Sequence, residues 1–222
     1  MSRQTVPESV AELAGLLGPE PDDIVREMEA HARETEFPTV GRAVGSWLSL
    51  LARATDARRV FEFGSGFGYS AYWFARGLPA DGELVLTEFD ADELEQARTY
   101  FERADLRPQV HFEHGDAIEL VDGYDGPFDI VLVDNEKSRY REAFETVRGK
   151  LEPGSLVLAD NALAGGTIRY DEVQSLVGGE PVADATDMSR DIAAYLDYVR
   201  SQAGMETVLL PLGEGVAVTL VT

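Results

Sequence analysis

Cysteine is absent from the 222 residues of this chain. The protein therefore has no disulfide bonds, no thiolate nucleophile and no thiolate ligand for a metal. Long apolar stretches are also missing, because no run reaches the roughly 18 residues that a membrane-spanning helix needs. The first residues, MSRQTVPESVAEL, lack the hydrophobic core of a secretory signal peptide. These absences predict a cytoplasmic protein that has no membrane partner.

Lysine is nearly missing as well: only Lys137 and Lys150 occur, against 17 arginines. Acidic residues outnumber basic ones by 41 to 19, which gives a formal net charge of −22. Because 44% of the residues are hydrophobic, the chain is not a disordered acidic tail. A folded, acidic, lysine-poor surface resembles that of proteins from extreme halophiles, in which salt screens the repulsion between like charges. We predict that the stability of this protein rises with salt concentration.

The strong negative charge also bears on partners. It argues against nonspecific binding to the phosphate backbone of a nucleic acid in ordinary salt. It is weaker evidence against a specific RNA partner, because an acidic surface can hide a small basic patch. We therefore expect no nucleic-acid partner, and the motifs of the chain have to indicate what it binds instead.

The stretch Val60–Ser70, VFEFGSGFGYS, is the most informative part of the chain. Its β-branched and aromatic residues predict a short buried strand, which ends at three alternating glycines and is followed by a helical pattern. Such a turn lets a ligand approach bare backbone at the start of a helix. Glu62 lies just inside the turn, and Glu88 follows Gly68 by 20 residues, where an acid suits the two hydroxyls of a ribose. The alternative is a glycine-rich turn that binds no ligand.

Residues 6–58 are predicted to be helical and to precede the sheet. The first helix ends before Gly18, the second is capped by Asp22 and Asp23 and runs through Arg33, and the third spans residues 41–54. One face of the third helix carries apolar residues that we predict to pack in the core: Val44, Trp47, Leu48 and Leu51.

Strands and helices alternate from residue 59 onward. The predicted strands are 59–63, 84–88, 109–113, 128–133 and 155–159, and the predicted helices are 69–77, 91–104, 138–150 and 167–177. This alternation predicts a parallel sheet covered on both faces. A helix at 189–203 is followed by two strands, 206–210 and 216–221, joined by a short glycine turn. The pattern predicts a Rossmann-like, doubly wound α/β sheet of seven strands with an antiparallel last strand beside the sixth, in a single domain, 1–222, on which residues 1–58 pack.

Polar residues follow each of the first five predicted strands. In an open parallel sheet, ligands bind at the carboxyl ends of the strands. The segments at these ends are Gly64–Ser70, Glu88, Gly115–Ala117, Asp134–Lys137 and Asp160–Asn161. A single acidic loop residue is usually just solvated, but five such ends in succession indicate a binding site.

Two of these strand ends carry residues that suit a metal ion. Asp134, Asp160 and Asn161 offer three hard oxygen ligands, which favour Mg²⁺, Mn²⁺ or Ca²⁺ over zinc. Lys137 lies three residues after Asp134, so its amine is expected near the metal. An amine can lose its proton and act as a base, whereas a guanidinium cannot. The alternative for Lys137 is an ordinary surface lysine.

Taken together, these motifs resemble one enzyme family. EFGSGFGYS at 62–70, Glu88, GDA at 115–117, Asp134-x-x-Lys137 and Asp160-Asn161 are similar to the metal-dependent class I S-adenosylmethionine O-methyltransferases, the catechol and caffeoyl-coenzyme A group. The resemblance extends from about Val40 to the C-terminal hairpin. It implies S-adenosylmethionine and a divalent metal, Mg²⁺ first, as cofactors, a small catechol-like or diol acceptor, and a homodimer.

The resemblance also implies roles for the matching residues. Glu62, Gly64 and Ser70 would hold the methionine part of the cofactor, Glu88 the ribose, and Asp116 with Ala117 the adenine. The full cofactor-binding set is Val40, Glu62, Gly64, Ser65, Gly66, Ser70, Glu88, Asp116, Ala117 and Asp134. Val40 would close over the methionine end. The metal ligands would be Asp134, Asp160 and Asn161, and the catalytic residues would be Lys137, as general base, and Asp134.

Three other functions share parts of this pattern. A nicotinamide-dependent oxidoreductase would show GxGxxG or a Tyr-x-x-x-Lys pair, but Val133 and Thr146 stand four residues before the two lysines. A methyltransferase acting on RNA or protein nitrogen often has an Asn-Pro-Pro-Tyr type motif after the fourth strand, where this chain has Asp134-Asn-Glu-Lys137. A non-catalytic cofactor-binding subunit would need no metal. In residues 162–166, ALAGG, the chain also lacks the tryptophan of plant-type relatives, so the acceptor stays open.

Overall fold

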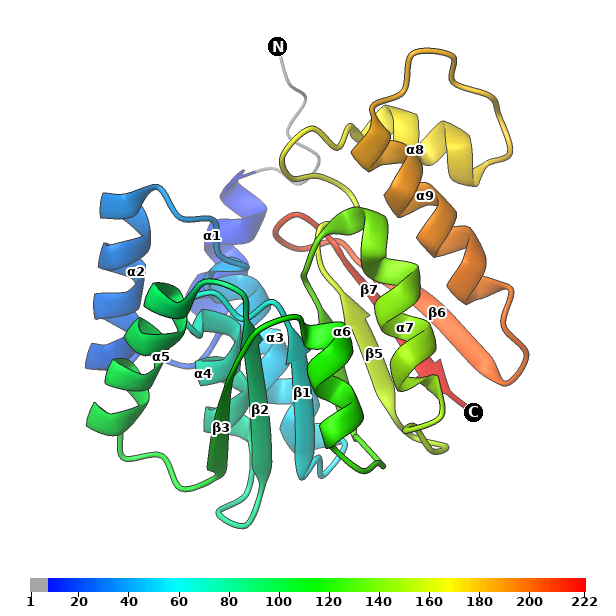
Figure 1. Ribbon diagram of the computed structural model, residues 1–222. Helices are drawn as coiled ribbons and strands as arrows, with labels where there is room; N and C mark the ends of the chain where they lie inside the picture. The colour runs from blue at the N-terminus through cyan, green and yellow to red at the C-terminus, as the bar shows by residue number, and fades with distance from the viewer. Residues whose placement is uncertain (1–7) are drawn as a thin grey trace.

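The computed structural model describes residues 8–222, so residues 6 and 7 of the predicted helical segment lie outside the described part. One mixed sheet runs through the molecule in the order β3-β2-β1-β4-β5-β7-β6 (Figure 1). The first five strands are parallel to their neighbours, and β7 is antiparallel to both β5 and β6. The strands are β1 Arg59–Phe63, β2 Glu83–Glu88, β3 Gln109–His114, β4 Ile130–Val133, β5 Leu156–Ala159, β6 Met205–Leu210 and β7 Val216–Val221. The predicted seven-stranded, Rossmann-like sheet with an antiparallel last strand is confirmed.

Helices cover both faces of the sheet. They are α1 Glu8–Leu17, α2 Asp23–Thr35, α3 Gly41–Ala54, α4 Tyr69–Gly77, α5 Ala91–Arg103, α6 Ala117–Leu120, α7 Tyr140–Arg148, α8 Tyr170–Val177 and α9 Asp187–Arg200, with 3₁₀ turns η1 Val121–Gly123 and η2 Lys137–Arg139. Buried residues of α2 to α5 pack on one face of the sheet, and those of α6, α7, α8 and α9 pack on the other (Figure 1). None of the helices in residues 8–222 is both long and apolar enough to cross a membrane.

Alternation of side chains along β1 explains why both faces are needed. Val60 packs in the core on the α3 and α4 side, and Phe61 and Phe63 pack in the core on the α7 side, because successive strand residues point to opposite faces. Phe61 has no exposed surface, so its truncation to alanine is expected to cost about 3–5 kcal/mol of stability.

The register of the parallel strands decides where their ends meet. Phe63 pairs with Thr87 of β2 and with Val133 of β4, and Val133 in turn pairs with Ala159 of β5. The next residue of each strand therefore reaches the same edge of the sheet. These four residues are Gly64, Glu88, Asp134 and Asp160, which brings the segments predicted at the strand ends together.

The prediction that Trp47 packs in the core is wrong. Val44 and Leu48 are 1% exposed, as expected, but Trp47 is 39% exposed. The buried row of α3 follows the four-residue spacing of Val44, Leu48 and Ala52, so Trp47 stands at its margin. There it lines a surface groove together with Leu50.

Candidate active site

Two adjoining cavities lie at the carboxyl edge of the sheet. The first has a volume of about 300 Å³ and the second about 420 Å³, and Gly64, Glu88 and Asp134 line both. The first cavity gathers most of the predicted site residues: Val40, Gly64, Ser65, Gly66, Ser70, Glu88, Asp134, Lys137, Asp160 and Asn161. Asp116 and Ala117 line the second. Glu62 lines neither cavity.

The glycine turn forms the floor between the two cavities. Gly64 and Gly66 have positive φ angles of 80° and 49°, which disfavour residues with side chains. A Cβ atom at Gly64 would lie 2.8 Å from the carbonyl oxygen of Asp134, and one at Gly66 would lie 2.8 Å from the ring of Phe37. The turn therefore leaves backbone, and no side chain, facing the space where a ligand would lie.

Glu88 ties the end of β2 to this turn. Its Oε2 accepts a hydrogen bond of 2.7 Å from the backbone N–H of Gly66. Its Oε1 accepts bonds of 2.8 Å and 3.0 Å from the N–H groups of Phe89 and Asp90. Because each carboxylate oxygen has about two acceptor sites, Glu88 can still accept hydrogen bonds from hydroxyls in either cavity.

Glu62 is held beneath the turn without exposed surface. Neither of its carboxylate oxygens has a hydrogen-bond partner among the residues that the structure describes. Burial, which disfavours the charged form, raises the pKa of Glu62 to about 8. A buried acid of this kind is a favourable neighbour for a positively charged ligand group.

Asp116 shapes the second cavity and has a partner that the sequence did not indicate. Its Oδ1 accepts a 3.0 Å hydrogen bond from the N–H of Ile118, which caps α6. Its Oδ2 accepts a 2.7 Å bond from Arg139, and this interaction lowers the pKa of Asp116. Arg139 also lines this cavity, although nothing in its sequence spacing pointed to a pair with a residue so far away in the chain.

The acidic pair and the lysine meet in the first cavity. Nζ of Lys137 donates a 2.9 Å hydrogen bond to Oδ1 of Asp134. Asp160 is 5% exposed, and its Oδ1 has no hydrogen-bond partner within residues 8–222. Burial, followed by the nearby charge of Asp134, raises the pKa of Asp160 to about 8, and burial also raises that of Asp134. Two carboxylates that raise each other's pKa are favourable sites for added positive charge.

Tyr140 joins this cluster and was missed from the sequence. Its hydroxyl accepts a 2.5 Å hydrogen bond from Nζ of Lys137 and lies 3.3 Å from the carbonyl oxygen of Asp160. Its ring is fully buried in the core on the α7 side. The sequence shows Tyr140 three residues after Lys137, a spacing that places both on one side of a helical turn, and this spacing was the available signal.

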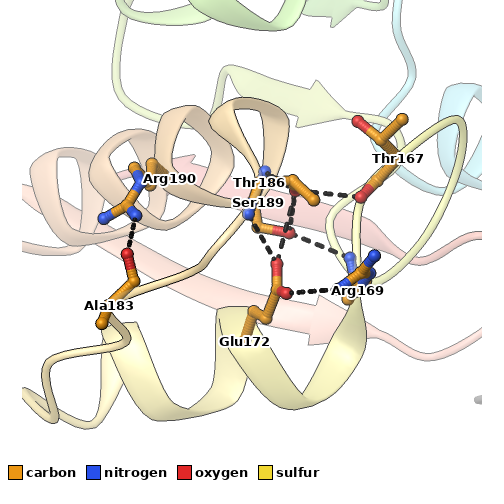
Figure 2. Close-up of polar contacts among 7 residues, drawn as sticks. All are labelled: Thr167, Arg169, Glu172, Ala183, Thr186, Ser189 and Arg190. Atoms are coloured by element: carbon orange, nitrogen blue, oxygen red, sulfur yellow. Dashed lines mark hydrogen bonds and ion pairs between the residues drawn. The ribbon is translucent and has the colours of Figure 1, made fainter.

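The far wall of the first cavity comes from the segment after β5. Gly165, Gly166 and Met188 line it. Figure 2 shows the polar contacts that hold this wall: Glu172 accepts hydrogen bonds of 2.9 Å from the N–H of Thr186 and 3.1 Å from Arg169. These contacts join the start of α8 to the start of α9, directly before Met188.

The donor set suits a hard cation better than a zinc ion. Among the described residues, no three His, Cys, Asp or Glu side chains gather as a metal cluster. The candidate set is instead two carboxylates, Asp134 and Asp160, with the carboxamide of Asn161, and all three line one cavity. The buried, unpartnered Oδ1 of Asp160 fits a cation ligand, because a buried oxygen without a partner is costly.

A Rossmann-like sheet with an antiparallel last strand, a glycine turn after β1 and acids at the strand ends defines the methyltransferase class of α/β folds. Within that class, the family described as O-methyltransferase matches residues 22–221. The chain therefore belongs to the O-methyltransferase family. This membership decides against a nicotinamide-dependent oxidoreductase.

Individual relatives agree with this assignment. The catechol O-methyltransferase of Niastella koreensis is 34% identical over 162 residues, which cover 70% of this chain and 73% of that protein. The catechol O-methyltransferase of Mycobacterium tuberculosis is 31% identical over 182 residues, covering 77% and 83%. The crystal structure of the O-methyltransferase TomG from Streptomyces achromogenes, involved in tomaymycin synthesis and solved in complex with SAM, is 26% identical, with a TM-score of 0.82 over 100% of both chains. The resemblance predicted from the motifs is confirmed.

Proposed function

We propose that the protein transfers the methyl group of S-adenosylmethionine to a hydroxyl of a small catechol-like or diol acceptor, assisted by a divalent cation, Mg²⁺ in the first place. One observation carries this proposal: Asp134, Lys137, Asp160 and Asn161 line the same cavity as the glycine turn and Glu88. The names of the two catechol O-methyltransferases among its relatives support the acceptor class. The net charge of −22 supports a small molecule over a nucleic acid.

The cofactor half of the site has a residue for each part of the methyl donor. Gly64, Ser65, Gly66 and Ser70 offer the turn and the start of α4 to its methionine part, Val40 closes that end, and the buried acid Glu62 complements its cationic amino group. Glu88 accepts the ribose hydroxyls. Asp116 and Ala117, in the second cavity, take the adenine. The acidic surroundings favour a positively charged sulfonium.

Asp134, Asp160 and Asn161 would hold the cation through hard oxygens. When bound, a divalent cation lowers the pKa of the hydroxyls that it holds and fixes their direction. Lys137 then has a defined task, because its Nζ is positioned by Asp134 and Tyr140 to receive the proton that the acceptor hydroxyl gives up. Alignment of the acceptor oxygen with the methyl group supplies much of the remaining acceleration.

The test is a transfer assay with labelled S-adenosylmethionine and a panel of diol acceptors at high salt. We expect turnover that needs Mg²⁺ and stops when the metal is chelated. Lys137→Met is expected to lower turnover at neutral pH by about 100-fold or more and to leave adenosylhomocysteine affinity unchanged, as measured by calorimetry. Turnover without metal, or full activity of Asp160→Ala, would contradict the metal mechanism, and a normal rate for Lys137→Met would exclude Lys137 as the base.

We also propose that two copies of the chain associate through α1 and α3. Apolar side chains are exposed there: Leu13 by 56%, Leu16 by 77%, Leu17 by 80%, Leu50 by 53% and Trp47 by 39%. Large apolar side chains gathered on a strongly charged protein indicate an interface.

Light scattering after size exclusion at high salt tests this association. The native chain is expected to be a dimer, and a double variant, Leu16→Glu with Leu17→Glu, is expected to be a folded monomer, because each substitution places a charge in the interface. Val208→Glu, at a residue that is 65% exposed on β6, is the matched control and should stay dimeric. A monomeric native chain, or a dimeric double variant, would contradict the interface.

A further inference from the structure

Glu214 enters the first cavity from the turn between β6 and β7. It lines this cavity together with Asp160 and Asn161. One of its carboxylate oxygens, Oε2, accepts a hydrogen bond from the side-chain amide nitrogen of Asn161. The turn is distant from Asn161 in sequence, so this contact exists only because the last two strands fold back beside β5.

Backbone hydrogen bonds fix the turn against the loop that follows β5. The N–H of Ala162 donates a 2.8 Å bond to the carbonyl of Gly215, and the N–H groups of Leu163 and Ala164 donate bonds of 2.9 Å and 3.0 Å to the carbonyl of Glu214. Three bonds between two short segments leave little freedom at the base of the Glu214 side chain. The carboxylate is therefore held in place and is not a mobile surface group.

The neighbouring glycines allow this approach. A Cβ atom at Gly165 would lie 2.5 Å from both Nδ2 of Asn161 and Oε2 of Glu214. A Cβ atom at Gly213 would lie 2.9 Å from a methyl group of Val44. Side chains at these positions would push apart the two groups that the hydrogen bond joins.

The chemistry of this hydrogen bond orients the Asn161 amide. An ionised carboxylate only accepts hydrogen bonds, so Asn161 has to present its NH₂ group, and not its carbonyl oxygen, to Glu214. The carbonyl oxygen, Oδ1, then points away from Glu214 with its lone pairs free. Without this partner, the two ends of the amide are nearly the same in shape and the group could turn over.

We propose that Glu214 is a positioning residue that keeps Oδ1 of Asn161 directed to the cation. This inference rests on the proposed function, because it needs the cation site of Asp134, Asp160 and Asn161. Partners that orient metal ligands in this way typically change metal affinity by about 10- to 100-fold when they are removed.

The experiment measures Mn²⁺ affinity by electron paramagnetic resonance in the presence of adenosylhomocysteine and without acceptor. Glu214→Ala is expected to weaken Mn²⁺ binding about 10-fold or more. Glu214→Gln keeps an oxygen that accepts from Asn161, so we expect it to stay within about 3-fold of the native protein. Glu206→Ala removes an exposed acid of the adjoining strand β6 and is expected to bind Mn²⁺ as the native chain does.

A double-mutant cycle tests the route through Asn161. Asn161→Asp has no amide to orient, so adding Glu214→Ala to it should weaken Mn²⁺ binding no further. If Glu214→Gln is as weak as Glu214→Ala, the charge of Glu214 and not its hydrogen bond explains the effect, and the inference is overturned. Native Mn²⁺ affinity in Glu214→Ala overturns it as well.

Two controls keep this inference apart from the proposed function. Thermal unfolding and adenosylhomocysteine affinity of each variant report whether the fold and the cofactor half are intact. If the native protein binds Mn²⁺ and only the Glu214 variants behave unexpectedly, the positioning role fails and the O-methyltransferase mechanism stands. If the native protein binds no Mn²⁺ at all, both fail together.

Discussion

The buried acid Glu62 gives the cofactor-free protein a predictable pH dependence. Its pKa is about 8 in the folded chain and near the ordinary value of 4.5 when unfolded. Between these values the folded state holds the proton that the unfolded state has lost, so the free energy of unfolding falls as pH rises from about 4.5 to about 8, by at most about 1.4 kcal/mol per pH unit. Above pH 8 the contribution stays constant.

Glu62→Gln is expected to remove this part of the pH dependence, because glutamine does not titrate. Urea unfolding of the native chain and of this variant between pH 5 and pH 8 measures the difference, and Glu206→Gln, at an exposed position of β6, is the matched control. The native curve should decline more steeply than the Glu62→Gln curve. Equal slopes would show that Glu62 titrates in the same way in both states.

At the level of elements, local patterns predicted the strands well and the helix boundaries less well. The predicted strand 59–63 coincides with β1 and the predicted strand 216–221 with β7, because short apolar runs bounded by glycine leave little choice. The predicted helix 189–203 begins earlier, at Asp187, because the side chain of Thr186 caps it, and capping residues were not considered there. The short helix α6 was missed for the same reason, since Asp116 caps it.

The candidate site divides in the same way. Residues that directly follow parallel strands, such as Asp134 and Asp160, could be placed together from topology alone, since the register brings successive strand ends to one edge. Glu214 could not, because its hairpin turn returns to the site from the far end of the chain. Arg139 likewise owes its place to a tertiary ion pair, and a single sequence carries no signal for such a contact.

The junction of α8 and α9 depends on one carboxylate. Glu172 has a side chain that is 8% exposed, and the N–H of Thr186, followed by other hydrogen bonds, lowers its pKa (Figure 2). A lowered pKa means that the ionised form stabilises the folded state above the unfolded pKa, and that this contribution is lost as pH falls through the folded pKa.

Glu172→Ala is therefore expected to lower the thermal unfolding midpoint at pH 7, and the loss should shrink as pH is reduced below 4. Calorimetry at both pH values measures it. Glu180→Ala, which removes an exposed acid after α8, should leave the midpoint unchanged. A loss from Glu172→Ala that is equal at both pH values would mean that packing, and not the ionised carboxylate, holds the junction.

The charge of the whole molecule sets its response to salt. A net charge of −22 is spread over the surface, and exposed ion pairs such as Arg58 with Asp81 offset little of it. Raising KCl from 0.1 M to 1 M shortens the screening length from about 10 Å to about 3 Å, so repulsion among the acids fades.

We expect the thermal midpoint to rise by several degrees over this range and then to level off, because screening saturates. Preferential exclusion of salt, by contrast, strengthens burial increasingly at higher concentration and is larger for sulfate than for chloride. A variant with four exposed acids neutralised tests the charge itself: Asp105→Asn, Asp122→Asn, Glu180→Gln and Glu206→Gln. This variant should melt higher than the native chain in dilute buffer and converge with it in molar KCl. Equal midpoints of the native chain in dilute buffer and molar KCl would show that its acidity does not limit its stability.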